Sequence, residues 1–245
     1  SMYFEPDRQG EITHRYVLGL YYIMDVLTSE FSEILFESCS SGGGRFDPGM
    51  LYYMPQTWCS DNTDAIERLR IQYGTSFGYP MSSVSAHVSV CPNHQNHRVT
   101  PFKTRGICAM QGTFGYELDL SKMTDEEKKM AGEQIAFFKE HGRLFQFGDY
   151  YRLTSPFENR DYTVWEYAAQ DGSEACMSVV YTDMYANAAS EIVKWKGLDP
   201  KKVYQMQLDG EDAGNFSGAA LMHAGILLPL PEQNYDAFQI YLKAE

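Results

Sequence analysis

The sequence has no surplus of basic residues. Lys and Arg total 20 against 33 Asp and Glu, which gives a net charge of −13. Nucleic acids and anionic membrane surfaces are bound through clustered Lys and Arg, so we expect no nucleic acid and no membrane among the partners. No apolar run approaches the roughly 18 residues that span a bilayer, and no basic segment precedes an apolar stretch. We therefore expect a cytoplasmic protein.

Cysteine is scarce and scattered. The five cysteines are Cys39, Cys59, Cys91, Cys108 and Cys176. An odd count at irregular spacing favours free thiols in a reducing compartment over a disulfide framework. The leading Ser1-Met2 is typical of a cloning remnant ahead of a methionine.

Apolar and aromatic residues are plentiful. The 245 residues, 44% of them hydrophobic, suffice for one large domain or two small ones. Aromatic residues make up 14% of the chain, with 18 Tyr. Aromatic faces bind sugars, nucleobases and proteins, so this is a hint of ligand binding and no more.

The first 120 residues alternate helix and strand patterns. Apolar spacing and turn residues predict helices over 11–29, 61–73 and 101–112, and strands over 34–39, 51–58, 75–80 and 113–120. Such alternation is typical of an α/β fold with a parallel sheet. Only four βα units are present, whereas a closed (β/α)₈ barrel needs eight. The pattern therefore fits a small open sheet or the second half of a barrel.

The pattern changes near residue 145. Thr124 to Glu127 form a capping box that opens a helix ending near Gly142. Short strands are then predicted over 150–153, 163–168, 175–181, 191–195, 203–206 and 238–242. This rhythm is typical of an antiparallel β-sandwich. We predict an α/β domain over 1–145 and an all-β domain over 146–245.

Asp61 is the most informative candidate residue. It stands between a predicted strand and a predicted helix, in the string WCSDNTD. A carboxylate at the carboxyl end of a barrel strand faces the active-site mouth. From the pattern alone, an N-cap is the favoured explanation of an Asp at a helix start, and Asp64 is explained as complementing the helix dipole.

The loop from Cys39 to Arg45 is rich in glycine. It lacks the Gly-Lys-Ser/Thr ending of a phosphate loop and the Gly-x-Gly-x-x-Gly dinucleotide fingerprint. One interpretation is a tight turn after a strand. The other is a binding loop, whose small residues let a ligand approach the backbone beside Cys39.

Four potential metal ligands crowd into one segment: His87, Cys91, His94 and His97. Their spacing matches no standard zinc pattern, and Pro92 breaks any helix that would align them. We favour a polar active-site loop or a hydrogen-bonded loop staple, and we expect no metal and no cofactor.

Several long strings carry a resemblance to a known family. They are ILFESCSSGGGRFDPGMLYYMPQTWCSDNTDAIERLRIQYGTSFGYP, RQGEITHRYVLGLYYIMDVL, SAHVSVCPNHQNHRVTPFKTRG, MQGTFGYELDL and FGDYYRLTSPFE. Together they closely resemble the α-galactosidases of glycoside hydrolase family 36, over at least residues 8–158. The resemblance implies about the last four βα units of a (β/α)₈ barrel followed by a β-sandwich, in a retaining hydrolase of terminal α-galactosides such as raffinose and melibiose.

The resemblance also implies roles for three residues. Asp61 matches the general acid/base in the family's Ser-Asp-x-x-Asp motif. Cys39 and Gly42 match the Cys-x-x-Gly-Gly-Gly-Arg loop that contacts the sugar near its 2-hydroxyl. Among relatives, one cleaving α-N-acetylgalactosamine or transferring galactose stays an alternative.

One departure from the family is large. The Lys-x-Asp motif that carries the nucleophile is missing, and a retaining mechanism needs both carboxylates. We therefore expect the chain to be inactive alone, and a non-catalytic sugar-binding or assembly module is the alternative from another class. Half a barrel leaves strand edges and an apolar face uncovered. We expect a homo-oligomer, or association with the missing amino-terminal half.

Overall fold

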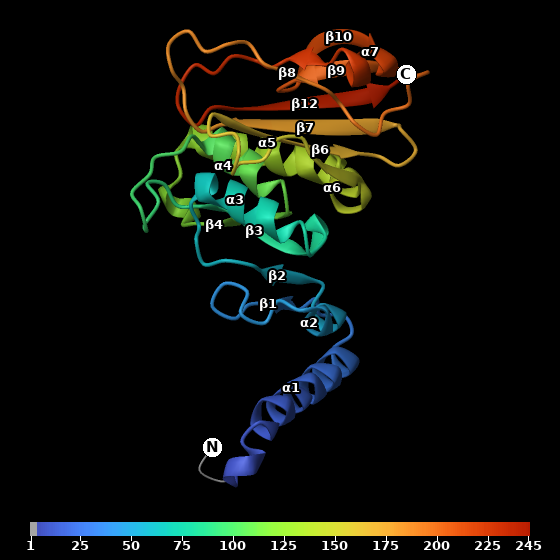
Figure 1. Cartoon of the computed structure of the whole chain (residues 1–245). Coiled ribbons are helices and arrows are strands. Elements are labelled where there is room, and N and C mark those ends of the chain that lie inside the picture. Colours follow the sequence, from blue (N-terminus) through green and yellow to red (C-terminus); the bar gives the residue numbers. More distant parts are fainter. Residues whose placement is uncertain (1–3) are drawn as a thin grey trace. The chain divides into compact units, whose positions relative to one another are not determined.

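Residues 4–245 are described by a computed structural model, shown in Figure 1. Ser1 and Met2, interpreted above as a cloning remnant, lie outside the described residues. The chain divides after Asp61 into a smaller amino-terminal unit and a larger unit of residues 62–245. Each unit is described by itself.

The smaller unit contains one long helix and two short parallel strands. A short 3₁₀ turn (η1, Pro6–Arg8) precedes helix α1 (Glu11–Glu30), close to the range predicted. Strand β1 (Glu37–Ser38) pairs in parallel with β2 (Gln56–Trp58), with Ser38 opposite Thr57. The predicted parallel pairing of strands is thus present here.

The predicted strand over 51–58 is wrong in its first half. Helix α2 (Pro48–Tyr53) occupies that part, and only Gln56–Trp58 is extended. The side chain of Asp47 accepts a hydrogen bond from the Met50 N–H and so caps the helix, and Pro48 fits the first helical turn. These two start signals outweigh the β-propensity of the tyrosines that follow.

In the larger unit, helix α3 (Ala65–Thr75) leads to a second parallel pair. After a 3₁₀ turn (η2, Met81–Ser83), β3 (Val84–Ser89) pairs in parallel with β4 (Thr113–Glu117). Helix α4 (Phe102–Ala109), which lies within the predicted helix over 101–112, connects them. Strand β3 was not predicted, because the sequence analysis expected no strand between residues 80 and 113. The predicted strand over 75–80 is wrong, because α3 runs to Thr75 and a turn follows it.

Helix α5 (Asp125–Glu140) follows the 3₁₀ turn η3 (Leu120–Lys122). Its predicted capping box is confirmed: Thr124 and Glu127 each accept from the other's backbone N–H. A small apolar core joins β3, α4 and α5 through Val88, Phe102 and Ala131. The α/β part of the larger unit is therefore held by its own buried contacts.

An antiparallel sheet of six strands dominates the rest of the larger unit. Its strands are β5 (Asp149–Arg152), β6 (Tyr162–Ala168), β7 (Glu174–Tyr181), β9 (Val203–Leu208), β10 (Glu211–Ser217) and β12 (Ala237–Ala244). The order is β10-β9-β12-β7-β6-β5, and every neighbouring pair is antiparallel. The predicted antiparallel part is confirmed, and β10 is the one strand of these six that the sequence analysis missed.

Both faces of this sheet are covered. Figure 1 shows α4, α5 and α6 (Gly142–Phe147) on one side of it. On that side the Tyr167 hydroxyl donates to the Gln111 carbonyl at 2.5 Å. The other side carries helix α7 (Gly218–His223) and a two-stranded ribbon of β8 (Ile192–Val193) and β11 (Ile226–Leu227).

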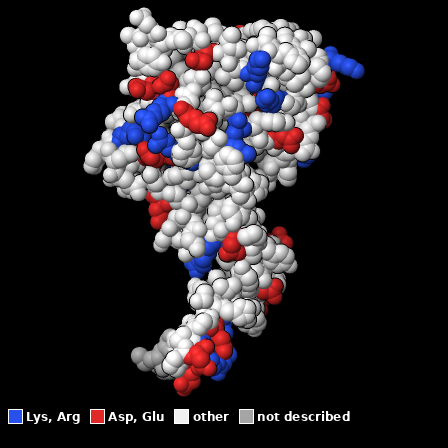
Figure 2. Space-filling model, viewed as in Figure 1, with Lys and Arg blue, Asp and Glu red and all other residues white. Residues whose placement is uncertain are grey.

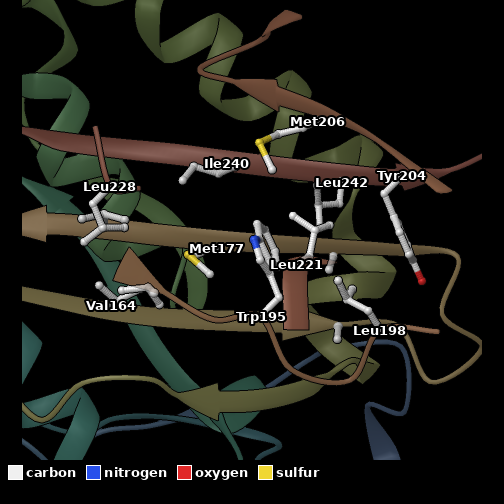
Figure 3. Close-up of a cluster of buried hydrophobic side chains, with 14 of the residues drawn as sticks. Val164, Met177, Trp195, Leu198, Tyr204, Met206, Leu221, Leu228, Ile240 and Leu242 are labelled. Atoms are coloured by element: carbon white, nitrogen blue, oxygen red, sulfur yellow. The ribbon is translucent and has the colours of Figure 1, made fainter. Parts of the chain in front are cut away.

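The main core lies between the sheet and this second cover. Figure 3 shows Trp195, Leu198 and Leu221 meeting sheet residues such as Met177 and Leu242. Trp195 and Leu221 are each 1% exposed, and Leu242 is fully buried. Burying such side chains supplies about 1.5–3 kcal/mol each, so this core is a principal source of the unit's stability.

Among residues 4–245, no helix combines the length and apolar character needed to cross a bilayer. All five cysteines are free thiols, as predicted. Burial raises the pKa of the Cys108 and Cys176 thiols, so these two are unreactive members of the core.

Candidate active site

The carboxyl ends of β1 and β2 place two of the predicted site residues. Cys39 directly follows β1, and Asp61 stands three residues beyond the end of β2. Parallel strands present their carboxyl ends at one edge, which is where ligands bind in α/β folds. Thr57 and Trp58 are buried in the strand, whereas Cys39 and Asp61 are exposed.

Gly42 lies directly against the backbone that leads into Asp61. A Cβ atom built on Gly42 would stand 2.6 Å from the Asp61 nitrogen and 2.9 Å from the Ser60 Cα. Its φ of +70° is also a conformation that favours glycine. The structure thus brings the glycine loop and Asp61 together, and only glycine fits at the point of contact.

The loop is closed by its own hydrogen bonds. The Gly44 N–H donates to the Ser40 carbonyl at 2.8 Å, and Nη2 of Arg45 reaches back to the Cys39 carbonyl at 3.5 Å. Nη1 of Arg45 lies 3.3 Å from the Tyr16 hydroxyl on α1. Arg45 therefore ties both ends of the loop together and joins them to the helix.

The end of the loop is fixed by Asp47. Its Oδ1 accepts from the Met50 N–H at 3.0 Å and from the Tyr21 hydroxyl at 3.1 Å, and this hydrogen bond raises the pKa of Tyr21. A Cβ on Gly49 would overlap the Tyr21 hydroxyl at 2.0 Å. The sequence analysis did not single out these residues, although the Asp-Pro-Gly string after the loop is a visible helix-start signal.

Asp61 is not the helix cap. Helix α3 begins at Ala65, and its N-cap is Asp64, which accepts from the N–H groups of Ile66 at 3.1 Å and Glu67 at 2.8 Å. The predicted helix start at residue 61 is therefore four residues early. Asp64, expected to complement the helix dipole from the first turn, is itself the N-cap, and the capping explanation of Asp61 is wrong.

The second half of the segment from His87 to His97 is a hydrogen-bonded staple, as one of the two favoured interpretations held, whereas His87 itself lies on strand β3. Asn93, only 4% exposed, donates from Nδ2 to the Thr63 hydroxyl at 3.0 Å. Gln95 accepts from the Thr63 N–H at 3.1 Å, and Arg98 forms an ion pair with Asp64. The loop thus anchors the chain immediately before α3.

The histidines of this segment do not gather. His87 on β3 contacts Glu117 on β4, with Nδ1 and Oε2 3.1 Å apart, and the Cys91 thiol faces the Thr100 carbonyl at 3.6 Å. In the described part of the chain, no three His, Cys, Asp or Glu side chains are grouped so that they could hold a metal ion.

Comparison with known proteins places this site in a family. The profile of the Melibiase family matches residues 1–148, and that of the glycosyl hydrolase family 36 C-terminal domain matches residues 162–242. The chain is 53% identical to the α-galactosidase AgaA of Geobacillus stearothermophilus over 98% of its length. It is 47% identical to the α-galactosidase Mel36A of Lactobacillus acidophilus over 97% of its length.

Solved structures agree with the sequence matches. The crystal structure of AgaA from Geobacillus stearothermophilus covers the whole chain with a TM-score of 0.94 and 52% identity. That of an α-galactosidase from Lactobacillus brevis also covers it, with a TM-score of 0.93 and 42% identity. The chain spans about a third of the length of these curated and solved relatives: 32% of AgaA and 32% of Mel36A in sequence, and 33% and 34% of the two structures. The chain therefore belongs to the Melibiase family, with a C-terminal domain of the glycosyl hydrolase family 36 type.

Proposed function

We propose that residues 1–245 supply the acid/base and a sugar-binding loop to a retaining α-galactosidase that hydrolyses terminal α-galactosides of the raffinose and melibiose type. The observation that carries the proposal is the contact between Gly42 and the Asp61 backbone at the carboxyl ends of β1 and β2. A variant of AgaA was solved in complex with raffinose, which supports this substrate class.

Asp61 is the proposed general acid/base. In a retaining glycosidase such a carboxylic acid protonates the departing glycosidic oxygen and later removes a proton from the attacking water. Its exposure suits this role, because substrate and water must both reach it. Asp64 is the N-cap of α3, so Asp61 does not serve as the helix cap.

Cys39 and Gly42 are the proposed sugar-contacting residues, near the 2-hydroxyl. The left-handed backbone at Gly42 and Gly43 keeps this loop free of bulky side chains. The missing side chains of Gly42 and Gly43 make room for the backbone of residues 59–61, so the loop lies against the segment that carries Asp61, where a sugar bound to Asp61 would meet it. The chemistry needs carboxylates and water, and we propose no cofactor and no metal.

The second carboxylate must come from elsewhere. The sequence contains no Lys-x-Asp nucleophile motif of the family, so Asp61 alone cannot form a glycosyl-enzyme intermediate. We propose that residues 1–245 are inactive by themselves and become active with a polypeptide that carries the nucleophile. Exposed apolar side chains on and after α1, such as Tyr22 and Leu35 at 71% and 72% exposure, support an association of this kind or self-association.

Complementation in trans tests the proposal. The chain is mixed with a polypeptide that corresponds to the part of AgaA preceding the matched region, and hydrolysis of melibiose is followed. We expect no turnover from either part alone, turnover from the mixture, and loss of turnover with Asp61→Asn. Turnover by the chain alone that vanishes in Asp61→Asn would contradict the proposed inactivity, and a fully active Asp61→Asn mixture would contradict the proposed role.

A non-catalytic module is the alternative that the missing nucleophile motif favours. Calorimetry with galactose separates the two. Galactose binding by the chain together with an inactive mixture would support the module, whereas restored hydrolysis supports the enzyme. Sedimentation of the chain alone tests self-association, for which a dilute monomer would be contrary evidence.

We also propose finer assignments of fold and location. The α/β part, over 1–145, is about the last four βα units of a (β/α)₈ barrel, and the profile matches at 1–148 and 162–242 support a boundary near residue 145. The six-stranded sheet and the β8–β11 ribbon are the two layers of the predicted β-sandwich over 146–245. The five free thiols support a cytoplasmic location.

A further inference from the structure

A small cavity in the larger unit collects arginine side chains. It measures about 220 Å³. Its wall is formed by α3, the β3–α4 and β5–β6 connections, the start of β6, Thr182 directly after β7 and Tyr235 shortly before β12. The charged residues that line it are Glu67, Arg70, Arg98 and Arg160. The lining thus contains three arginines and one glutamate, although the chain as a whole has a net charge of −13. Figure 2 shows Lys and Arg atoms gathered beside Asp and Glu atoms at the left of the larger unit.

One arginine of the cavity, Arg98, already has carboxylate partners. Arg98 forms an ion pair with the buried carboxylate of Asp64, and its Nη2 lies 3.6 Å from Oε1 of Glu67. It also stacks on the Tyr235 ring, 5.3 Å from the ring centroid. Arg98 therefore pairs with both carboxylates near the cavity, offsets one of their two negative charges and is a fixed part of the wall.

The other two arginines keep most of their hydrogen-bonding capacity. Arg70 donates only from Nε, to the Pro156 carbonyl at 3.4 Å, so its two terminal nitrogens have no partner within residues 4–245. The Arg160 side chain makes no ion pair or hydrogen bond within that range either. Because an arginine carries five N–H donors, these two side chains offer several donors and two positive charges to the same space.

The rest of the polar wall also offers donors and is held in place. Oδ1 of Asn159 accepts from the N–H groups of Asp161 at 2.9 Å and Tyr162 at 3.2 Å, which leaves its Nδ2 as a donor. The Thr182 hydroxyl donates to the Arg160 carbonyl and fixes the backbone of that arginine. The carbonyl of Tyr235, a residue with φ of +62°, accepts from the Thr104 hydroxyl at 2.5 Å.

We propose that this cavity binds a phosphate group, either free phosphate or the phosphate of a small monoester. Guanidinium groups match phosphate oxygens with paired N–H donors, and such charge-assisted bonds are about twice as strong as neutral ones. The volume equals roughly seven water molecules at about 30 Å³ each, which accommodates a phosphate with a small organic group attached. None of its lining residues belongs to the candidate active site, and the proposal does not depend on the proposed hydrolysis.

Calorimetry on the full chain tests the site. Inorganic phosphate, glycerol 3-phosphate and uncharged glycerol are titrated at constant ionic strength into the native chain and into the Arg70→Gln/Arg160→Gln double variant. We expect both phosphate compounds to bind the native chain, and both to bind at least about tenfold more weakly to the double variant because two charge-assisted contacts are lost. Tighter binding of the monoester would identify an organic phosphate as the ligand, and equal affinities would identify free phosphate.

The control variant is Arg143→Gln on α6, an exposed arginine that contacts the Phe147 ring and no anion. It changes the net charge by one without touching the cavity, and we expect native phosphate affinity from it. Thermal unfolding in phosphate-free buffer checks that the double variant folds. The proposal is overturned if the native chain binds neither phosphate compound, or if the folded double variant binds them as tightly as the native chain.

Discussion

The backbone nitrogen of Asp61 lies 2.6 Å from the place where a Cβ on Gly42 would stand. The glycine loop and the acid/base segment are therefore built as one unit, in which each fixes the other. Any side chain at Gly42 must move the Asp61 backbone or leave the left-handed conformation.

Gly42→Ala tests this relationship. We expect it to lower turnover of the complemented enzyme about a hundredfold, because displacing a catalytic group by about 1 Å has effects of that size. Strain at the left-handed φ costs a further 1–3 kcal/mol or so of stability. The measurement is melibiose hydrolysis in the trans-complementation mixture.

Gly132→Ala on α5 is the matched control. No atom lies within 4 Å of a Cβ built there, and alanine favours a helix. Its mixture should keep native turnover. If Gly42→Ala were as active as this control, the loop and Asp61 would not be coupled as the contact implies.

Asp61 and Asp64 should separate into a catalytic and a structural role. Asp64→Ala removes the cap of α3 and leaves Arg98 without its principal partner, so we expect the free energy of unfolding to fall by about 2–4 kcal/mol. Asp61→Ala removes no cap, and we expect a smaller loss of about 0.5–1.5 kcal/mol, the usual contribution of one hydrogen bond. Urea unfolding of the two single variants measures both, and equal losses would mean that Asp61 also supports the fold.

How far the sequence predicts this fold is clear from particular elements. Strands β6, β7 and β12 lie within two residues of their predicted ranges, because their apolar residues recur without interruption between clear turns. Strand β10, with the sequence EDAGNFS, was missed because it is an edge strand whose residues are nearly all exposed. Its hydrogen bonds to β9 hold it, and the sequence carries no sign of them.

The candidate site, too, could be predicted from the sequence only in part. A carboxylate after a strand is visible in the sequence, but the residue that caps α3 is decided by which of Asp61 and Asp64 reaches the first N–H groups. The partnership of Arg98 with Asp64 joins residues 34 positions apart, and that of Arg45 with Tyr16 joins residues 29 apart. Contacts at such separations depend on the tertiary fold, so spacing alone could not reveal them.

The leaving group should determine how much Asp61 matters. A poor leaving group such as the glucose of melibiose needs a proton as the glycosidic bond breaks, whereas a nitrophenolate leaves without one. We expect Asp61→Asn to lower the rate constant of glycosidic bond cleavage by about 10²–10⁴-fold for melibiose. For a dinitrophenyl galactoside we expect a far smaller decrease in the same rate constant. Rapid-mixing kinetics of the complemented enzyme measure this, and equal losses with both substrates would assign Asp61 another role.

Glu166 should make the stability of the larger unit depend on pH. Burial raises the pKa of its carboxyl to about 8 from an ordinary 4.5, and hydrogen bonds from the Lys196 backbone N–H oppose this only in part. The folded chain thus holds a proton that the unfolded chain releases, so its stabilising effect is complete below pH 4.5 or so and is lost as the pH rises toward 8. We expect the free energy of unfolding to fall across this range by an amount on the order of 4 kcal/mol relative to Glu166→Gln, which cannot ionise.

Urea unfolding from pH 5 to pH 9 measures the difference, with Glu211→Gln on the exposed β10 as the control that should follow the native curve. A native chain and a Glu166→Gln variant with parallel pH profiles would show that this carboxyl is already ionised in the core, held by the Lys196 backbone more strongly than burial opposes it.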